Sequence, residues 1–313
     1  MSQSPDLASV ADNDALARAA SAFAVAEYDS LEAKLACVAS IPPVSQAAFD
    51  VLRMVESNRY APLQIAAAVA RDASLCADVL RVANRGAESD QAKNVVVLED
   101  AVVRIGPERL GELALANSKL AENTAPLLRW INVDSVWRRS VAAGVAIDLI
   151  LAQGDYSHAG EGLFMSAILH PLGRVVLGTL YPEQQQRMTK ICDSGGQALE
   201  EQEEQAYCLT HGQVLASLLR MWNIPDAICA PIAYAFHSYP HVATLEEPLR
   251  TKTELLKVAI LIGRMAAGDW ECCDRLEFPP ASLLERLGVH WLSRLVPQTR
   301  SDSQKIIDFR PEA

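Results

Sequence analysis

Residues 166–178 of the chain read SAILHPLGRVVLG, an apolar helical pattern that runs into a histidine followed directly by a proline. Proline lacks the backbone amide that a helix interior needs, and it disfavours helical geometry in the residue before it. His170-Pro171 is therefore expected to mark a helix end. A histidine in this position is either part of an ordinary helix end or part of a functional site. Residues elsewhere in the chain help to decide between these two interpretations.

The apolar spacing of the whole chain predicts an all-α fold. Apolar residues recur at intervals of three and four, and the only short β-type run is NVVVL at 94–98. Helix breaks and changes in composition predict four parts. They are an Ala-rich helical leader at 1–40, an N-terminal helical subdomain at 41–122, a larger helical bundle at 123–270, and a C-terminal helical extension or tail at 271–313.

Individual helix limits follow from Gly and Pro. Glycine is common just after the end of a helix and proline in its first turn. One helix is therefore expected to end at Gly106 and the next to begin at Pro107. By contrast, LEEQEEQAYCLTHGQVLASLLRMW at 199–222 is expected to form a single long helix. Its acidic run EEQEE at 200–204 is interpreted as a solvated face of that helix.

Charge and composition exclude several classes of partner. The 313-residue chain has a formal net charge of −11, of which −5 falls on residues 1–130 and −6 on the rest. No basic face or tail stands out, and phosphate neutralisation needs clustered Lys and Arg, so we expect no nucleic-acid partner and no membrane partner. The seven cysteines form no Cys-x-x-Cys pair and no signal peptide precedes the helices, which indicates a reduced, cytoplasmic setting.

The motifs of common catalytic sites are missing from the sequence. It contains no P-loop, no Gly-x-Gly-x-x-Gly after a strand, no Gly-x-Ser-x-Gly and no His-Glu-x-x-His. What remains are three histidines placed at expected helix ends, namely His170, His211 and His237. Since a helix C-terminus attracts histidine through its dipole, each of these residues taken alone is more often structural than a ligand.

Five segments that follow one another in the chain carry a resemblance to a known family. They are IPPVSQAAFDVLRMVES, ARDASLCADVLRVANR, LEDAVVRIGPERLGELALA, SAILHPLGRVVLGTLYPE and THGQVLASLLRMWNIPDAICAPIAYAFHS. Their order and spacing resemble the HDOD family, regulatory or signalling modules that are related to the HD-domain metal-dependent phosphohydrolases. The resemblance covers roughly residues 37–270. It implies a bacterial protein in which a smaller N-terminal helical subdomain packs on an HD-domain-like helical bundle.

The resemblance also places the metal ligands of the HD-domain relatives on this sequence. The first histidine falls on Arg139, the His-Asp doublet on His170 and Pro171, and the later aspartate near Gly263. Both carboxylates and one histidine are then lost, a change of about +3 in local charge that opposes a cation. These four positions are therefore interpreted as a degenerate metal centre. Rebuilding it would require histidine at 139 together with aspartate at 171 and 263.

Histidines that bind metal in some family members match His211 and His237. With His170 they would leave three imidazoles and no carboxylate, a set from which a bare three-histidine zinc site is conceivable. We expect instead no bound metal, no cofactor and no catalytic residue, because hydrolytic metals generally use charged oxygen ligands.

Two interpretations of Arg139 remain open. In the first, Arg139 forms a salt bridge on a helix surface with Asp134 or Asp148. In the second, its guanidinium occupies the former metal cavity and binds an anion bidentately, with His170 and His211 as neighbouring donors. Arg139, His170, His211 and His237 are accordingly the candidate residues of a ligand pocket.

Three functions from different classes are consistent with these residues. The first is a non-catalytic signalling module that acts through protein–protein contacts with signalling partners, and it is the one that we favour. The second is a residual metal-dependent phosphohydrolase. The third is a regulator that binds an anionic or nucleotide ligand in the eroded pocket.

Overall fold

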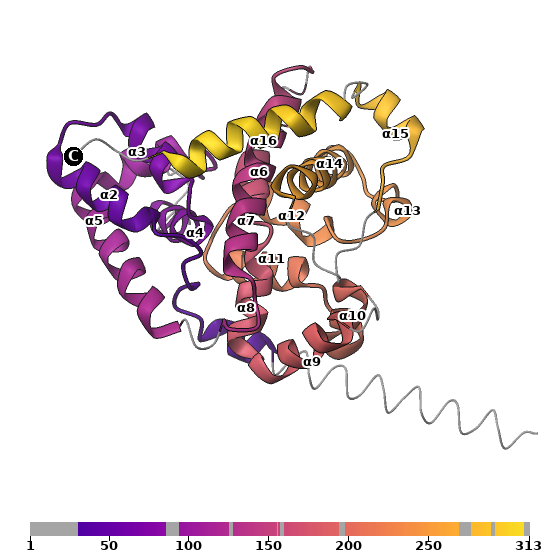
Figure 1. Cartoon of the computed structure of the whole chain (residues 1–313), viewed down its shortest axis with the longest axis horizontal. Coiled ribbons are helices and arrows are strands. Elements are labelled where there is room, and N and C mark those ends of the chain that lie inside the picture. Colours follow the sequence, from indigo (N-terminus) through magenta and orange to yellow (C-terminus); the bar gives the residue numbers. More distant parts are fainter. Residues whose placement is uncertain are drawn as a thin grey trace, which may run out of the picture.

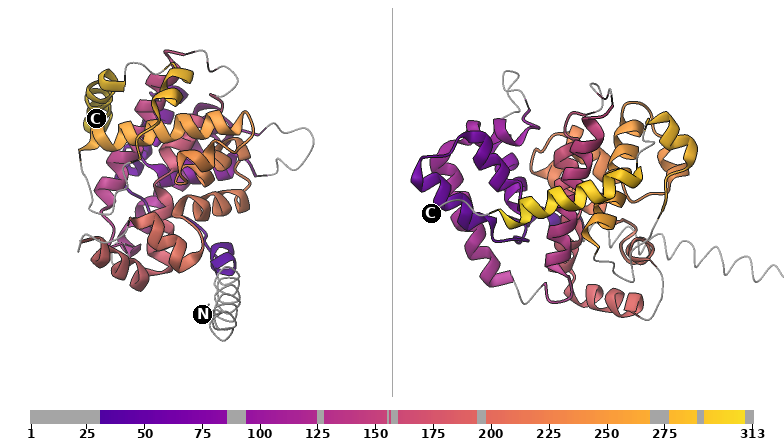
Figure 2. Two further views of the ribbon diagram at one scale, coloured as in Figure 1. Left: turned by 90° about the vertical axis from the view of Figure 1, so that its right-hand side faces the viewer. Right: turned by 45° about the horizontal axis from the view of Figure 1, so that its top comes forward.

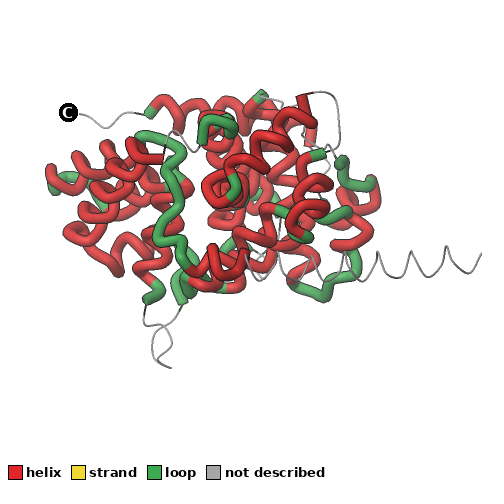
Figure 3. The backbone as a smooth tube through the Cα atoms, turned by 90° about the horizontal axis from the view of Figure 1, so that it is seen from below, coloured by secondary structure: helices red, strands yellow, loops and turns green. Residues whose placement is uncertain are grey.

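A computed structural model of the chain describes residues 31–85, 94–124, 128–154, 156, 160–193, 198–268, 277–288 and 292–309. Within these ranges every regular element is a helix, as Figures 1 and 3 show. The predicted all-α fold is confirmed. The β-type run at 94–98 lies in the segment that leads into a helix, and the described residues form no strand.

The helices fall into an N-terminal group, a central group and a C-terminal pair. The N-terminal group is α2 (Ala47–Ser57), α3 (Pro62–Val69), α4 (Ala73–Ala83) and α5 (Leu98–Thr124). The central group is α6 (Val133–Leu151), α7 (Leu163–Leu169), α8 (Leu172–Leu180), α9 (Pro182–Asp193), α10 (Leu199–Tyr207), α11 (His211–Met221), α12 (Asp226–Tyr234), α13 (Tyr239–Val242) and α14 (Leu249–Ala267). The C-terminal pair is α15 (Ala281–Arg286) and α16 (Leu292–Asp308).

In the N-terminal group, one buried aspartate joins the start of α4 to the loop before α2. Asp72 caps α4, and its Oδ1 accepts hydrogen bonds from the backbone amides of Ser74 and Leu75. Its Oδ2 accepts from the amides of Val44 and Ser45 at 3.1 and 2.7 Å, across 27 or 28 residues of chain. Because the first amides of a helix have no intrahelical acceptor, this carboxylate stabilises α4 and positions the entry to α2 at once.

The predicted break between two helices at Gly106 is present inside α5. Gly106 has φ +74° and ψ 166°, a backbone conformation that residues with a side chain rarely adopt, and Pro107 starts the following helical segment. α5 packs on α2, α3 and α4 and so completes the N-terminal group, seen on the left of Figure 1.

The central group is built around the contact of α6 with α14, the most extensive between any two helices. Small residues let the two backbones approach closely. A Cβ built on Gly263 of α14 would lie 2.8 Å from the backbone nitrogen of Ala143 on α6, closer than real Cβ atoms come. Glycine is therefore required at this position, and both helices are buried along the contact.

The single long helix expected at 199–222 is wrong. The chain turns at Cys208, which has φ +57°, and α11 starts afresh at His211 behind a Thr210–Gln213 capping box. The acidic run was also misinterpreted as solvated. Glu203 is wholly buried and Glu200 is 7% exposed, so two of its carboxylates belong to the interior. The turn brings α10 back across the start of α11.

The two ends of the described chain pack on the bundle. Residues 31–36, the last part of the predicted leader, are helical, and Leu31 and Leu35 lie in the core, whereas residues 1–30 are outside the described part. α16 crosses α6 and packs on α14, and Figures 1 and 2 show it reaching from the side of α15 toward α3. The proposed limits of the four parts stay a prediction.

The segment Leu163–Leu180, which includes α7 and α8, is long and apolar enough to cross a membrane, with a mean hydropathy of 1.5. In the fold it is 83% buried among the other helices. This segment therefore serves as the centre of the helical core, as Figure 1 illustrates. α14 carries several charged residues and is likewise buried through its middle.

Candidate functional site

His170 lies at the junction of two core helices. It follows the last residue of α7, and Pro171 occupies the N-cap position of α8, so the sequence HP at 170–171 is a helix end followed at once by a helix start. The Nδ1 atom of His170 lies 2.7 Å from the carbonyl oxygen of Ala167. A carbonyl can only accept, so Nδ1 carries the proton and donates it.

Burial keeps the imidazole of His170 neutral. The residue is 3% exposed, and loss of solvation lowers its pKa from 6.5 to about 3, against the smaller raising effect of the Ala167 carbonyl. Arg264, His211 and Arg139 each lower the pKa of His170 further through their charge. The structure thus brings Arg139, His170 and His211 together, as expected for the candidate pocket, and adds Arg264 to them.

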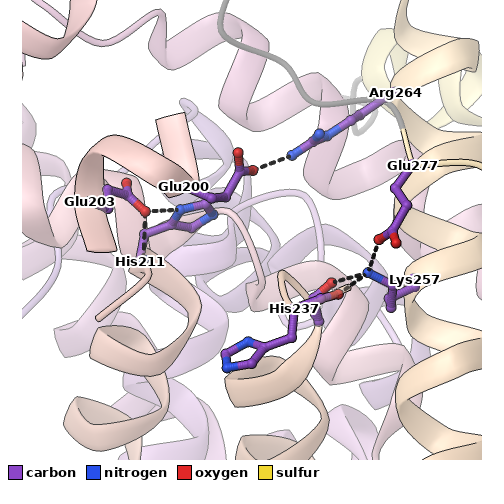
Figure 4. Close-up of polar contacts among 8 residues, drawn as sticks. Glu200, Glu203, His211, His237, Lys257, Arg264 and Glu277 are labelled. Carbon is purple, nitrogen blue, oxygen red and sulfur yellow. Dashed lines mark hydrogen bonds and ion pairs between the residues drawn. The ribbon is translucent and has the colours of Figure 1, made fainter. Parts of the chain in front are cut away.

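His211 is held by a buried carboxylate that the sequence did not reveal as a partner. Glu203 Oε2 accepts from the backbone amide of His211 and from its Nδ1, each at 2.8 Å (Figure 4). Gly173 on α8 lies against the backbone of His211, where a Cβ would overlap its carbonyl oxygen. His211 begins α11 and does not end a helix, so the expectation of a C-terminal position was wrong.

An aromatic ring fills the space between the two histidines. The ring of Phe236 lies 4.0 Å from that of His211 and 6.3 Å from that of His170, measured between centroids. Gly212 leaves room for this ring, because a Cβ there would meet Phe236 at 2.6 Å. The imidazoles are therefore in contact with a hydrocarbon surface, which is no ligand for a cation of a hydrolytic site.

The surface salt bridge expected for Arg139 is not formed. Arg139 is 4% exposed and lies in the interior on α6. Asp134 pairs instead with Arg138, whose Nε lies 2.7 Å from its carboxylate. Asp148 opens onto a separate cavity beside α16. The burial of Arg139 and its effect on the charge of His170 agree with the position that the second interpretation gives it, and anion binding by Arg139 stays a prediction.

Gly263 and His237 do not join the group. Gly263 faces the backbone of α6, so aspartate cannot be placed there without separating α6 from α14. The ring of His237 lies beside Tyr234 and His241, with centroids 5.8 and 4.5 Å away. Its pKa is lowered by burial and by the charges of His241 and Lys257. The three imidazoles therefore do not converge.

No group of three or more His, Cys, Asp or Glu side chains suited to a metal ion occurs in the described ranges. Two further histidines, His158 and His290, lie outside those ranges. The site presents imidazoles, guanidinium groups and an aromatic ring, and its two buried carboxylates, Glu203 and Glu200, already contact His211 and Arg264. This set of side chains fits a divalent cation poorly.

Two ion pairs border a small cavity next to this group (Figure 4). Arg264 lies 3.8 Å from Glu200, and Lys257 lies 3.0 Å from Glu277. Lys257 also donates to the carbonyl oxygens of Ala235 and His237. The cavity measures about 50 Å³, which is room for roughly one or two water molecules.

Sequence reasoning missed Glu200 and Glu203 because EEQEE was interpreted as one solvated face of a continuous helix. A signal was present, since Thr210 and Gln213 have the spacing of a capping box and announce a helix start. A helix that starts at His211 implies that the chain turns just before it, so the helix over 199–207 can fold back against the new helix.

Solved structures with the same fold include two bacterial proteins. One is the MmoQ response regulator of Methylococcus capsulatus str. Bath, 22% identical, with a TM-score of 0.64 over 83% of this chain and 99% of that one. The other is a virulence factor of Campylobacter jejuni subsp. jejuni, 14% identical, with a TM-score of 0.64 over 91% and 98% of the two chains. At these identities the likeness concerns the fold alone.

A curated relative is an uncharacterized protein of Treponema pallidum (strain Nichols), 24% identical over 212 residues. The match covers 67% of this chain but only 40% of the relative, so the chain spans about two fifths of that protein. The model of the HDOD domain matches residues 41–238, which include α2 to α12 and therefore Arg139, His170 and His211 but not Arg264 of α14. The chain belongs to the HDOD family.

Proposed function

We propose that this protein is a regulatory HDOD module that acts through contacts with other proteins and performs no metal-dependent hydrolysis. Its membership of the family supports the regulatory part, as does its fold, which it shares with a response regulator. A formal net charge of −11 that is spread over both halves of the sequence also suits protein partners better than nucleic acid.

One observation carries the non-catalytic part of the proposal, namely the buried guanidinium of Arg139 beside a neutral His170. A divalent cation at this place would have to approach two arginines that already disfavour a single positive charge on His170. The imidazole of His170 could offer only Nε2, since Nδ1 donates to Ala167. Arg139 is thus a fixed cation in a position where the HD-domain relatives are expected to use a histidine.

The alternative of an anionic or nucleotide ligand finds little support around Arg264 and Lys257. Both cations are already paired, with Glu200 and Glu277, and the cavity between them is about 50 Å³. Sites for small organic ligands are typically about 300–1,000 Å³. A nucleotide would therefore have to break both ion pairs and push the helices apart.

Hydrolysis assays test the proposal directly. Purified full-length protein is incubated with Mn²⁺, Fe²⁺ or Zn²⁺ and with a chromogenic phosphodiester or a panel of nucleotides. His170→Gln serves as the site variant, and His241→Gln, at an exposed histidine, serves as its matched control. We expect background rates for all three proteins. Turnover by the wild type that is lost in His170→Gln and kept in His241→Gln would establish the hydrolase instead.

A further inference from the structure

A second and larger cavity lies where the three groups of helices meet. It measures about 410 Å³ and is bordered by α3 of the N-terminal group, by α6 and α7 of the central group, and by the end of α16. Figure 1 shows α16 passing across α6 toward α3 at this place. The volume is within the range of about 300–1,000 Å³ that is usual for small-molecule sites, which favour such junctions.

The walls of this cavity are mainly hydrocarbon. Val141 and Val145 come from α6, Phe164 and Ile168 from α7, and Ile306 from α16. Phe309, which is 45% exposed, follows α16 at the rim. Removing this apolar surface from water by covering it with a ligand would be favourable, at about 25 cal/mol for each Å².

Three charged side chains border the cavity, and two of them are neutralised by the protein itself. Arg71 lies 2.7 Å from Asp50, and Lys305 lies 2.8 Å from Asp302. Asp148 of α6 is the third. No described residue makes a hydrogen bond or ion pair with its carboxylate, which opens onto the cavity.

Asp148 is an exposed residue of α6 whose carboxylate borders the cavity and also reaches solvent. The hydrocarbon around this carboxylate desolvates it in part and raises its pKa from 3.8 to about 6. Since no described residue pairs with the carboxylate, a cation that enters the cavity can pair with it without displacing a protein group. The charge that complements this cavity is therefore positive.

We propose that the cavity between α3, α6, α7 and α16 binds a small amphipathic cation, with its apolar body against Val145 and Phe164 and its protonated amine paired with Asp148. An anion would face an unpaired carboxylate, and a neutral molecule would leave that carboxylate unsatisfied. The ligand would contact all three groups of helices at once. This site lies beyond the proposed function, because it shares no lining residue with the group around His170.

Three probes of nearly the same shape test the proposal on the full-length protein. They are naphthylmethylamine, which is a cation, naphthylmethanol, which is neutral, and naphthoic acid, which is an anion. Affinities are measured at pH 7.5 by calorimetry or ligand-observed NMR. We expect the amine to bind roughly tenfold or more tightly than the alcohol, the ratio that a charge-assisted hydrogen bond supports, and the acid to bind weakest.

Variants test whether the probes bind in this cavity and whether Asp148 is the group that recognises the amine. Asp148→Asn should bring the affinity of the amine down to that of the alcohol, whereas Asp134→Asn, on the same helix but outside this cavity, should leave the ratio unchanged. Ala67→Trp on α3 should block all three probes, and Val145→Phe is a second blocking variant on α6.

Three results would overturn the proposal. They are equal affinities for the three probes, an amine preference that survives Asp148→Asn, and binding that both blocking variants leave intact. The absence of binding by any probe would overturn it as well.

Discussion

A single carboxylate oxygen, Oε2 of Glu203, accepts hydrogen bonds from both the backbone amide and the ring Nδ1 of His211, each at 2.8 Å. Both side chains are at most 2% exposed. The pair ties α10 to the first residue of α11 across the turn at Cys208, and it fixes the imidazole against Phe236. In this protein a buried carboxylate of the chain itself therefore holds the histidine of the candidate site in place.

Glu203→Gln should destabilise the fold because the amide oxygen of glutamine accepts the same two hydrogen bonds from His211 only as a neutral acceptor. Hydrogen bonds to charged groups contribute about 1 kcal/mol more each than neutral ones, so we expect a loss of about 1–2 kcal/mol. Chemical denaturation measures it. Glu204→Gln, one residue on and exposed, is the control and should stay within about 0.5 kcal/mol of the wild type. Equal stability of the two variants would show that the pair contributes nothing.

His170 should make the stability depend on pH. The unfolded imidazole takes up a proton near pH 6.5, but the folded one does so only near pH 3. The unfolded state therefore binds more protons between these values. Stability from this group is complete above pH 6.5 and is lost as the pH falls toward 3.

His170→Gln removes that titration and should flatten the fall in stability between pH 7.5 and 5 relative to the wild type. The exposed His241→Gln variant should keep the slope of the wild type. Comparing variants at each pH cancels the opposite contributions of Asp78 and Asp148, whose pKa values are raised to about 6. Parallel curves for the wild type and His170→Gln would contradict a buried neutral imidazole.

Gly263→Ala should separate α6 from α14. Its Cβ would lie 2.8 Å from the backbone of Ala143, and overpacking of this kind costs about 1–3 kcal/mol. Gly111→Ala in α5 is the matched control, since its Cβ would meet only a side-chain methyl of Val55 at 3.8 Å. That control should be neutral or stabilise by up to about 1 kcal/mol. The reverse order of the two stabilities would contradict the close contact.

The same contact corrects the route to a restored metal centre that the sequence suggested. Aspartate at 263 is larger than alanine and would meet the α6 backbone at its Cβ. Gly263→Asp would therefore force α6 away from α14, and the correspondence of Gly263 with the later aspartate stays a prediction. Replacements at 139 and 171 that leave Gly263 in place test the remaining ligands without forcing these two helices apart.

Asp148→Asn should stabilise the protein in the absence of ligand. The folded pKa, about 6, exceeds the unfolded value of 3.8, so the ionised carboxylate costs stability at neutral pH and none once it is protonated. Because Asp148 is exposed, solvent screens much of this cost and the gain should be small. The midpoint of thermal unfolding should rise at pH 7.5, and the difference should vanish below about pH 4. Asp134→Asn is the control. It loses an exposed ion pair with Arg138 that is worth at most about 1 kcal/mol, so its midpoint of thermal unfolding should not rise.

The fold was largely predictable from the sequence because helix spacing and breakers are local signals. Pro62 opens α3 and Gly106 interrupts α5 as expected, since proline and glycine act on the backbone of their own segment. The turn at Cys208 escaped prediction. A non-glycine residue in the left-handed region has no comparable signature.

The site was predictable only in part, because it depends on contacts between distant segments. The resemblance to HDOD proteins placed Arg139, His170 and His211 in one region, and the charges that act on His170 agree with that placement. It could not show that Glu203 turns inward or that Arg264 faces Glu200. His237, matched by its position in the motif, has its ring beside His241 instead.

Metal stoichiometry of the wild-type protein tests the central claim most directly. Full-length protein is saturated with Mn²⁺, Fe²⁺ or Zn²⁺, freed of excess metal by desalting and analysed by elemental mass spectrometry. With Arg139 and Arg264 beside a neutral His170, we predict well under one equivalent of any metal, and the same background in His170→Gln. One equivalent in the wild type that is lost in His170→Gln and retained in His241→Gln would contradict the account.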